Sequence, residues 1–198
     1  MIFEPQPVLL EGRHVRLEPL APGHLPALCA AAGDPAVFRW FLTRPLSDPA
    51  EMAAWFEEAL RNQAGGAEVA FATVRRTDGR VVGSTRFMDL RRAHRTLEIG
   101  NTWLAPEAQR TAINTEAKYL MLRQAFETWG AVRVQLKTDE RNHQSRAAIA
   151  RLGAVFEGIL RNYQTRTCDG YVRNTAMFSI TDREWPAVKA GLEAKLAR

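Results

Sequence analysis

The spacing of apolar residues divides this chain into alternating strands and helices. Apolar residues at alternate positions predict strands over residues 8–20, as a pair divided by Gly12, and over 69–74, 81–87, 97–104, 132–137, 155–161 and 171–180. Apolar residues at helical spacing predict helices over residues 22–32, 48–63, 114–129, 142–152 and 181–196. The three strands between residues 69 and 104 have short connections, which predicts an antiparallel meander. The helix 114–129 then crosses between two strands, which favours parallel pairing of those strands.

The segment between the strand 97–104 and the long helix is a short loop of small and polar residues, Gln109 to Asn114. Asn114 and Thr115 are good N-caps, and Glu116 suits the positive end of the helix dipole. A strand, loop and helix in this order aim several free backbone N–H groups at one point, where a phosphate binds well. The alternative is a turn that binds no ligand.

The loop Gln109-Arg110-Thr111-Ala112-Ile113-Asn114 resembles the pyrophosphate loop of the GCN5-related N-acetyltransferases (GNAT), whose pattern is Gln/Arg-x-x-Gly-x-Gly/Ala. Ala112 and Asn114 stand where the family has glycine or a small residue. Ala112 requires a negative φ, whereas Asn114 tolerates the left-handed region. The pyrophosphate contacts are therefore the part of the resemblance that these departures affect most.

A second segment, from Asn142 through Ser145 to Ala154, resembles the family's Asn-x-x-Ser/Ala…Leu-Gly-Phe motif. Its last residue, Ala154, stands where Phe is usual. The two motifs occur in the family's order and are separated by one helix and one strand. Over nearly the whole chain, the sequence looks like the branch of the family that acetylates the N-termini of ribosomal proteins.

The resemblance implies an α+β fold with α/β/α layers, the GNAT acyl-CoA N-acyltransferase fold, in a single domain over residues 1–198. Its central sheet is mixed and largely antiparallel, and it splays between the strands before and after the long central helix. In this family acetyl-CoA, the acetyl donor, lies in that opening, and no metal is expected. The implied cofactor contacts are Thr102, Trp103, Leu104, Gln109, Arg110, Thr111, Ala112, Ile113, Asn114, Thr115, Asn142 and Ser145.

Amine acetylation needs one group that takes a proton from the acceptor and another that returns a proton to the leaving thiolate. The resemblance implies Glu98 as the base, acting directly or through water. The alternative is a strand carboxylate paired with Arg86 or Arg95. Ile149 stands where many family members have a tyrosine acid, so Ser145 is the implied acid. The alternative for Ser145 is a serine that only caps its helix.

Aromatic residues in two segments are candidates for contacts with the acceptor amine. In this family the linker between the first two helices forms one wall of the acceptor cleft, and a hairpin near the C-terminus covers it. Phe38, Trp40 and Phe41 lie in the predicted linker, and Tyr163 and Tyr171 flank the predicted hairpin loop. The alternative for each linker ring is a role as a core plug beneath an irregular loop.

Composition and charge limit the kinds of binding partner that we expect. The net charge of +5 comes from scattered arginines, so no direct nucleic-acid binding is expected. No apolar run approaches the ~20 residues that span a bilayer, and no signal-peptide pattern is present, so we expect a cytoplasmic protein without a membrane partner. Cys29 and Cys168 lie far apart without ligand-spaced partners, which argues against a metal site or a disulfide.

The resulting prediction is an acetyl-CoA-dependent N-acetyltransferase that acts on a primary amine, as a monomer or homodimer. The acceptor is a protein N-terminus or a small molecule such as a polyamine or an antibiotic. Two functions compete with it: a regulatory protein that binds acetyl-CoA with little turnover, and an RNA-binding module supported by basicity alone.

Overall fold

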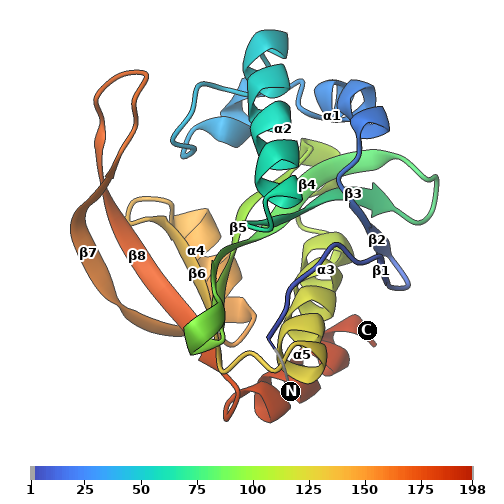
Figure 1. Cartoon of the computed structure of the whole chain (residues 1–198), viewed down its shortest axis with the longest axis vertical. Helices are drawn as coiled ribbons and strands as arrows, with labels where there is room; N and C mark the ends of the chain where they lie inside the picture. Colours follow the sequence, from blue (N-terminus) through green and yellow to red (C-terminus); the bar gives the residue numbers. More distant parts are fainter. Residues whose placement is uncertain (1–2, 198) are drawn as a thin grey trace.

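The computed structural model describes residues 3–197, whose strands form one eight-stranded sheet in the order β1-β2-β3-β4-β5-β6-β8-β7 (Figure 1). Every neighbouring pair is antiparallel except β5 and β6, which are parallel. The strands are β1 (Leu10–Glu11), β2 (Val15–Pro19), β3 (Val69–Arg75), β4 (Val81–Arg91), β5 (Thr96–Leu104), β6 (Arg133–Asp139), β7 (Val155–Thr165) and β8 (Val172–Thr181).

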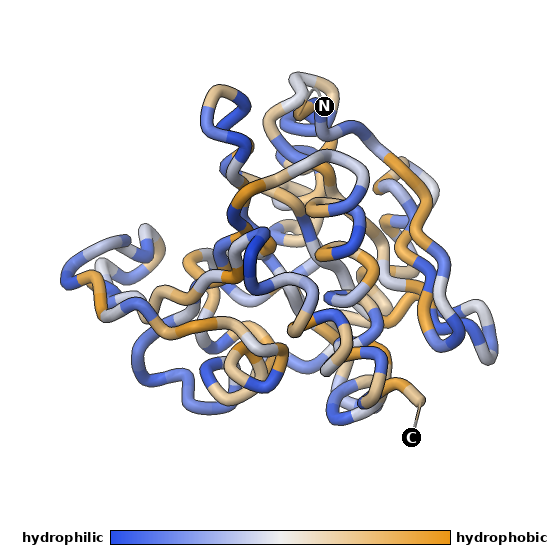
Figure 2. The backbone as a smooth tube through the Cα atoms, turned by 90° about the horizontal axis from the view of Figure 1, so that it is seen from below, coloured by the Kyte–Doolittle hydropathy of each residue, from blue (hydrophilic) through white to orange (hydrophobic). Residues whose placement is uncertain are grey.

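Helices cover both faces of this sheet. Figure 1 shows α1 and α2 on one side and α3 and α5 on the other. The projecting loops are mostly hydrophilic (Figure 2), as expected for segments that run over the surface. The helices are α1 (Leu25–Ala31), α2 (Pro49–Ala64), α3 (Ala112–Arg123), α4 (His143–Arg151) and α5 (Trp185–Leu196), with a π-helical turn, Gln124–Thr128, after α3. Short 3₁₀ turns lie at Pro22–His24, Pro35–Phe38, Arg92–His94 and Pro106–Ala108.

Each face of the sheet has its own apolar core. Leu97 and Ile99 of β5 belong to the core beneath α3 and α5, together with Trp185. Trp103, also on β5, belongs instead to the core beneath α1 and α2, where it meets Phe38. The predicted α+β fold, with its antiparallel meander and its parallel pair flanking the long helix, is confirmed.

Two helices begin at a residue other than the first of their predicted spans, and in both cases a feature of the first turn explains the difference. Helix α3 begins at Ala112 rather than Asn114, because the hydroxyl of Thr111 accepts the N–H of Ile113 at 3.3 Å. Helix α5 begins at Trp185 rather than residue 181, which places Pro186 in the first turn, where its missing N–H costs nothing.

The strands β5 and β6 pair over three residues only. The parallel register runs from Thr96 with Arg133 to Glu98 with Gln135, and there it stops. Strand β6 continues its pairing with β8 as far as Asp139, so β5 is the strand that turns away. Asn101 has a φ of 48° and the register against β4 shifts there, which marks a bulge in β5. The predicted opening of the sheet therefore begins just after Glu98.

Helix α4 follows β6 and packs against β6 and β8. Asn142 is its N-cap: the side-chain carbonyl accepts the N–H of Ser145 at 3.0 Å. This cap places the first turn of α4 at the side of the opening that faces β5. Within residues 3–197, no helix is long and apolar enough to cross a membrane.

Candidate active site

A cleft of about 1130 Å³ opens where β5 and β6 separate. One end lies against the start of α3, and the other reaches the linker between α1 and α2 and the strands β7 and β8. Twelve of the predicted site residues line it: Trp40, Phe41, Glu98, Thr102, Trp103, Leu104, Gln109, Arg110, Thr111, Asn114, Asn142 and Ser145. The structure thus brings the two motifs and the β5 carboxylate to one cavity.

The start of α3 supplies backbone donors at one end of the cleft. The first N–H groups of a helix have no carbonyl one turn earlier to bond with. Thr111 accepts the N–H of Ile113, which leaves those of Ala112 and Asn114 for solvent or a ligand. Arg110 just before the cap adds a positive charge to this wall of the cleft. The arrangement suits a phosphate group.

The backbone conformation of this loop corrects one part of the prediction. Asn114 lies inside α3, so its tolerance of the left-handed region is not used. The left-handed residue is Arg110, with a φ of 58°. Ala112 is the first residue of the helix, where its Cβ needs no unusual φ. The side chains of Ile113 and Thr115 are buried and do not line the cleft, so only their backbone groups can serve a ligand there.

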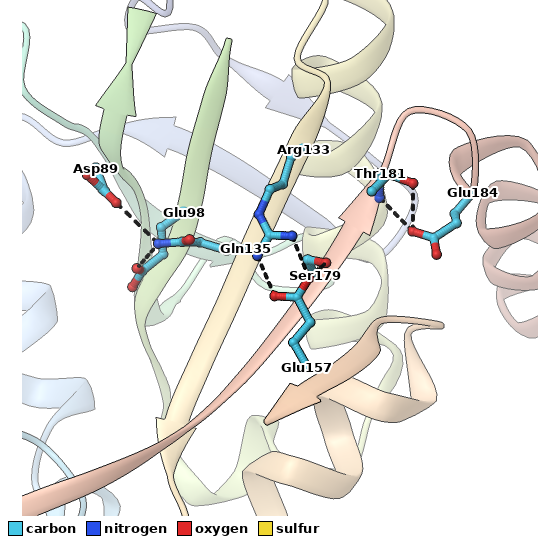
Figure 3. A network of polar contacts seen from close by, with 8 residues as sticks. All are labelled: Asp89, Glu98, Arg133, Gln135, Glu157, Ser179, Thr181 and Glu184. Carbon is cyan, nitrogen blue, oxygen red and sulfur yellow. Dashed lines mark hydrogen bonds and ion pairs between the residues drawn. The ribbon is translucent and has the colours of Figure 1, made fainter. Parts of the chain in front are cut away.

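Glu98 stands at the point where the sheet opens and is 2% exposed. Its Oε2 accepts a hydrogen bond from Gln135 at 3.0 Å (Figure 3). The same oxygen forms an ion pair with the ammonium group of Lys137 at 2.8 Å. Gln135 also donates to Asp89, which fixes the amide between the two carboxylates. The pairing predicted as the alternative role, with Arg86 or Arg95, is absent from the described residues.

The second oxygen of Glu98 is the one that remains for chemistry. Among residues 3–197 no group donates to Oε1, and a Cβ on Gly100 would lie 2.8 Å from it. Glu98 and Gly100 therefore share one face of β5, and Gly100 keeps that face open beside the carboxylate. A carboxylate held by one oxygen and open at the other is placed to accept a proton from the cleft.

Ser145 lies across the cleft from β5, in the first turn of α4. Its backbone N–H is bonded to Asn142, but its hydroxyl has no partner among the described residues. The capping residue of α4 is Asn142, so the alternative in which Ser145 serves only as a cap does not describe this helix. Asn142 uses its carbonyl oxygen for the cap and keeps its amide N–H₂ for a ligand.

The aromatic residues of the α1–α2 linker lie in two environments. Phe38 is 1% exposed, packs edge-to-face on Trp103 at 5.3 Å, and does not line the cleft. Trp40 and Phe41 do line it. Phe38 is thus the residue of this linker that packs into the core, as the alternative role predicted, whereas Trp40 and Phe41 face the cleft.

The two predicted tyrosines lie outside the main cleft. Tyr171 lines an adjoining hollow of about 220 Å³ with Trp40 and three arginines, and its hydroxyl donates to Asp139 at 2.8 Å. Burial raises the pKa of the Tyr171 hydroxyl, and its hydrogen bond to the carboxylate of Asp139 raises that pKa further. Tyr163 is exposed, and the ammonium group of Lys137 lies 5.5 Å from its ring centroid.

Lys118 is a cleft residue that the sequence analysis did not identify. Its ammonium group is buried and donates to the hydroxyls of Thr85 at 2.9 Å and Thr102 at 2.6 Å. Burial without a carboxylate partner lowers the pKa of Lys118 to about 7. The signal was available, because Lys118 falls on the apolar stripe of its helix, four residues before Leu122.

Arg86 and Arg173 are two further cleft residues that sequence reasoning missed. Arg86 is fully buried, pairs with Glu68 at 2.8 Å and stacks over the ring of Trp55 at 4.2 Å. Arg173 is 7% exposed, and the only hydrogen bond its side chain makes within residues 3–197 is from Nε to the hydroxyl of Thr175 at 3.0 Å. Both lie on strands. The alternation of apolar and polar residues predicts which side chains of a strand face the core, but it gives no sign that an arginine lines a cleft.

Comparison with known proteins places this fold and cleft in one family. Residues 14–155 match a family model described as an acetyltransferase (GNAT) domain. A GCN5-related N-acetyltransferase structure from Brucella melitensis is 32% identical, with 96% of this chain and 86% of that chain covered and a TM-score of 0.88. The chain therefore belongs to the GNAT acetyltransferase family and is an N-acetyltransferase of that type.

Two other solved structures extend the comparison. A candidate acetyltransferase from T. thermophilus is 41% identical, covers 97% of both chains and has a TM-score of 0.82. RimJ from Mycobacterium smegmatis, solved in complex with CoA-disulfide, is 21% identical, with 98% and 95% coverage and a TM-score of 0.80. At that identity RimJ shows a shared fold. A search of curated proteins finds no match.

Proposed function

We propose that this protein transfers the acetyl group of acetyl-CoA to a primary amine bound in the cleft between β5 and β6. The observation that carries the proposal is the end of the β5–β6 pairing at Glu98, in a cleft that Thr111 at the start of α3 and Ser145 of α4 also line. RimJ, which has the same fold and was solved in complex with CoA-disulfide, supports a CoA thioester as the donor.

The chain's residues suit acetyl-CoA as the donor. The free N–H groups at the start of α3, with Arg110 beside them, would hold the pyrophosphate. Beyond Glu98 no strand within residues 3–197 pairs with the edge of β5 that faces β6. The carbonyls of Gly100 and Leu104 accept from the side chains of Thr102 and Gln109, and the remaining backbone groups of this edge would bind the amides of the pantetheine arm. Bound acetyl-CoA supplies the acetyl group as a thioester.

Glu98 and Ser145 then divide the proton transfers. Glu98 Oε1 takes a proton from the acceptor ammonium or amine, directly or through one water. The ion pair with Lys137 at the other oxygen holds the carboxylate in place. Ser145 returns a proton to the leaving sulfur from the opposite wall, and Asn142 fixes the helix turn that carries it. Trp40 and Phe41 form the wall that the acceptor meets first.

The first candidate acceptor is the α-amine of a protein N-terminus, because the chain resembles the branch that acetylates ribosomal proteins. Small-molecule amines are the second. A third possibility is a regulatory protein that binds acetyl-CoA without turnover. The two substituted glycine positions of the loop and the missing tyrosine support this possibility. All three functions use the same donor site. The two enzyme functions differ in the amine that enters from the α1–α2 side, and the regulatory function differs from both in its lack of turnover.

The decisive experiment measures donor binding and turnover on the same preparation. Calorimetry with acetyl-CoA should show binding to the wild type and none to Thr111→Glu. A carboxylate at the cap would repel the phosphates and occupy the space that they need. Release of free thiol should then require a primary amine and be followed by mass detection of the acetylated product. Unchanged acetyl-CoA affinity in Thr111→Glu contradicts the donor site, and binding without thiol release on any amine favours the regulatory protein.

A further inference from the structure

The face of the sheet that carries Glu98 also carries a row of charged side chains across the two strands beyond it. Glu98 of β5 pairs in register with Gln135 of β6, and Lys137 lies two residues further on the same face of β6. Lys137 in turn is opposite Met177 of β8, and Arg173 lies four residues earlier on that face. Arg173 therefore lies on the proposed acceptor side of the sheet, in the same cleft as the proposed base.

Arg173 is charged, buried and without an ion-pair partner among residues 3–197. Its Nε is bonded to a neutral hydroxyl, that of Thr175, and its two terminal nitrogens have no hydrogen-bond partner in the described chain. The nearby carboxylates have other partners: Asp139 accepts from Tyr171 and Arg141, and Glu98 from Lys137. Burial lowers the pKa of the Arg173 guanidinium, but an arginine stays protonated at neutral pH.

The carboxylates of Asp139 and Glu98 oppose the loss of charge on Arg173, but a buried cation without an ion-pair partner is still costly, which makes a function for it worth seeking. Arg86, in the same cleft, shows the compensated arrangement, with its own carboxylate at 2.8 Å and an aromatic ring beneath it. Arg173 has the planar pair of N–H₂ groups free that binds a carboxylate or phosphate through two parallel hydrogen bonds. A carboxylate or phosphate that enters the cleft from outside the chain would fit these two groups.

The approach to this part of the cleft is also rich in arginine. Arg39, Arg141 and Arg166 surround the adjoining hollow with Trp40 and Tyr171. Asp169 forms an ion pair with Arg166, and Asp139 Oδ1 lies 3.4 Å from Arg141 Nε. Within residues 3–197 no carboxylate pairs with Arg39. This arrangement steers an anionic group toward Arg173 and disfavours a molecule that carries only positive charges.

We infer that the acceptor is an amine that also carries a carboxylate or phosphate group, and that Arg173 binds this group while the amine faces Glu98. The inference rests on the proposed function, which it deepens by naming the substrate class. Arg173 is a specificity-determining residue for the acceptor and takes no part in proton transfer. Polyamines, which have no anionic group, are poor acceptors on this basis.

Matched acceptors of equal shape test the inference. Peptides with an N-terminal Asp and with an N-terminal Asn differ by one charge, as do alanine and alaninamide, and spermidine serves as the all-cationic member. We expect kcat/KM for the acidic member of each pair to exceed that for its amide by at least about tenfold, the value of one charge-assisted hydrogen bond. The preference should appear mainly in KM and should fall as salt is added.

Variants assign the preference to Arg173. Arg173→Gln should remove the difference between the paired acceptors while leaving acetyl-CoA affinity unchanged, and Arg173→Lys should retain part of it. Arg133→Gln is the matched control, because Arg133 lies on β6 outside the cleft, where it pairs with Glu157. That control should keep the full preference. Circular dichroism checks that each variant is folded before kinetics are compared.

Binding separates failure of the inference from failure of the proposed function. Calorimetry with the paired acceptors in the presence of CoA needs no turnover. Tighter binding of the acidic member to the wild type than to Arg173→Gln supports the inference. If thiol release is absent at the same time, that absence contradicts only the proposed catalysis. Thiol release with equal kcat/KM and equal binding for acid and amide overturns the inference while the proposed catalysis stands.

Discussion

Two buried glutamates, Glu116 and Glu98, show how this fold uses the same side chain in different ways. Glu116 of α3 accepts three backbone hydrogen bonds from the β1–β2 turn: from Arg13 at 2.8 Å, His14 at 2.6 Å and Val15 at 2.8 Å. Both of its oxygens are used. Glu98 of β5 is equally buried, but its partners meet one oxygen and the other faces the cleft.

The difference lies in what each carboxylate leaves unsatisfied. The Glu116 carboxylate fills the turn so closely that a Cβ at Gly12 would lie 2.4 Å from its carboxyl carbon. Only glycine fits there, and no space remains for a ligand. Burial alone therefore does not identify a catalytic carboxylate in this chain. The distinguishing feature is a buried carboxylate whose hydrogen-bonding capacity is incomplete and whose free oxygen borders a cavity.

The largest expected effect is on turnover. Glu98→Gln preserves shape and removes the proton acceptor, so turnover at neutral pH should fall by about 10³-fold, within the range for a positioned general base. Acetyl-CoA affinity should stay constant, because no donor contact is assigned to this side chain. Thiol-release kinetics and calorimetry on one preparation measure both quantities. Wild-type turnover in this variant would remove the proposed distinction between the two glutamates.

The reciprocal substitution should affect stability instead. Glu116→Gln replaces one acceptor oxygen by an N–H₂ group that faces backbone N–H donors, so the free energy of unfolding should fall by about 3 kcal/mol. Urea unfolding followed by circular dichroism measures this loss. Turnover per folded molecule should equal that of the wild type at a temperature where both are folded. A variant that is fully stable but inactive would reverse the roles assigned here.

Ser145→Ala tests the other wall of the cleft. Loss of the hydroxyl should lower turnover by about 10²-fold, the usual range for one general acid. The cap at Asn142 uses only the backbone N–H of Ser145, so the substitution leaves α4 intact. Acetyl-CoA affinity, measured by calorimetry, should therefore change little. Turnover equal to the wild type would show that another group protonates the leaving sulfur.

Lys118→Met tests a pH dependence of stability whose sign is known. The pKa of Lys118 is lowered to about 7 in the folded state, whereas it is about 10.4 in an unfolded chain. Between those values the unfolded chain binds more protons, so wild-type stability gains with rising pH from this residue. Lys118→Met should be more stable relative to wild type by roughly 4 kcal/mol at pH 6 than at pH 10.

Thermal unfolding of Lys118→Met and the wild type across this pH range measures the effect. The hydroxyls of Thr85 and Thr102 lie 2.8 Å apart and can still bond to each other without the lysine. An unchanged difference between the two proteins at pH 6 and pH 10 would show that Lys118 keeps its charge in the folded state.

The sequence predicted those features that local periodicity encodes. The meander, the crossover helix and the position of Glu98 on β5 follow from alternation and from the resemblance. The bulge at Asn101 does not, and it turns Thr102 toward Lys118 of α3 while Trp103 joins the opposite core. Alternation through residue 104 gives no sign of this change of face.

Contacts between distant segments were the other part that the sequence could not supply. Glu116 was assigned to the helix dipole, whereas it binds a turn about a hundred residues earlier in the chain. Arg173 gave no signal, because its lack of a partner is visible only when the neighbours of β8 are known. Pairing depends on the tertiary fold, and a single sequence records only the residue type.

The pH–rate profile of Glu98→Gln, with Glu116→Gln as control, tests the central claim most directly. For the wild type and the Glu116 variant, turnover should reach a plateau below the pKa of the acceptor amine, because a positioned base takes the proton. In Glu98→Gln that plateau should be lost, and the residual rate should keep rising toward the pKa of the acceptor amine. A profile of unchanged shape in Glu98→Gln would contradict the assignment of Glu98 as the base.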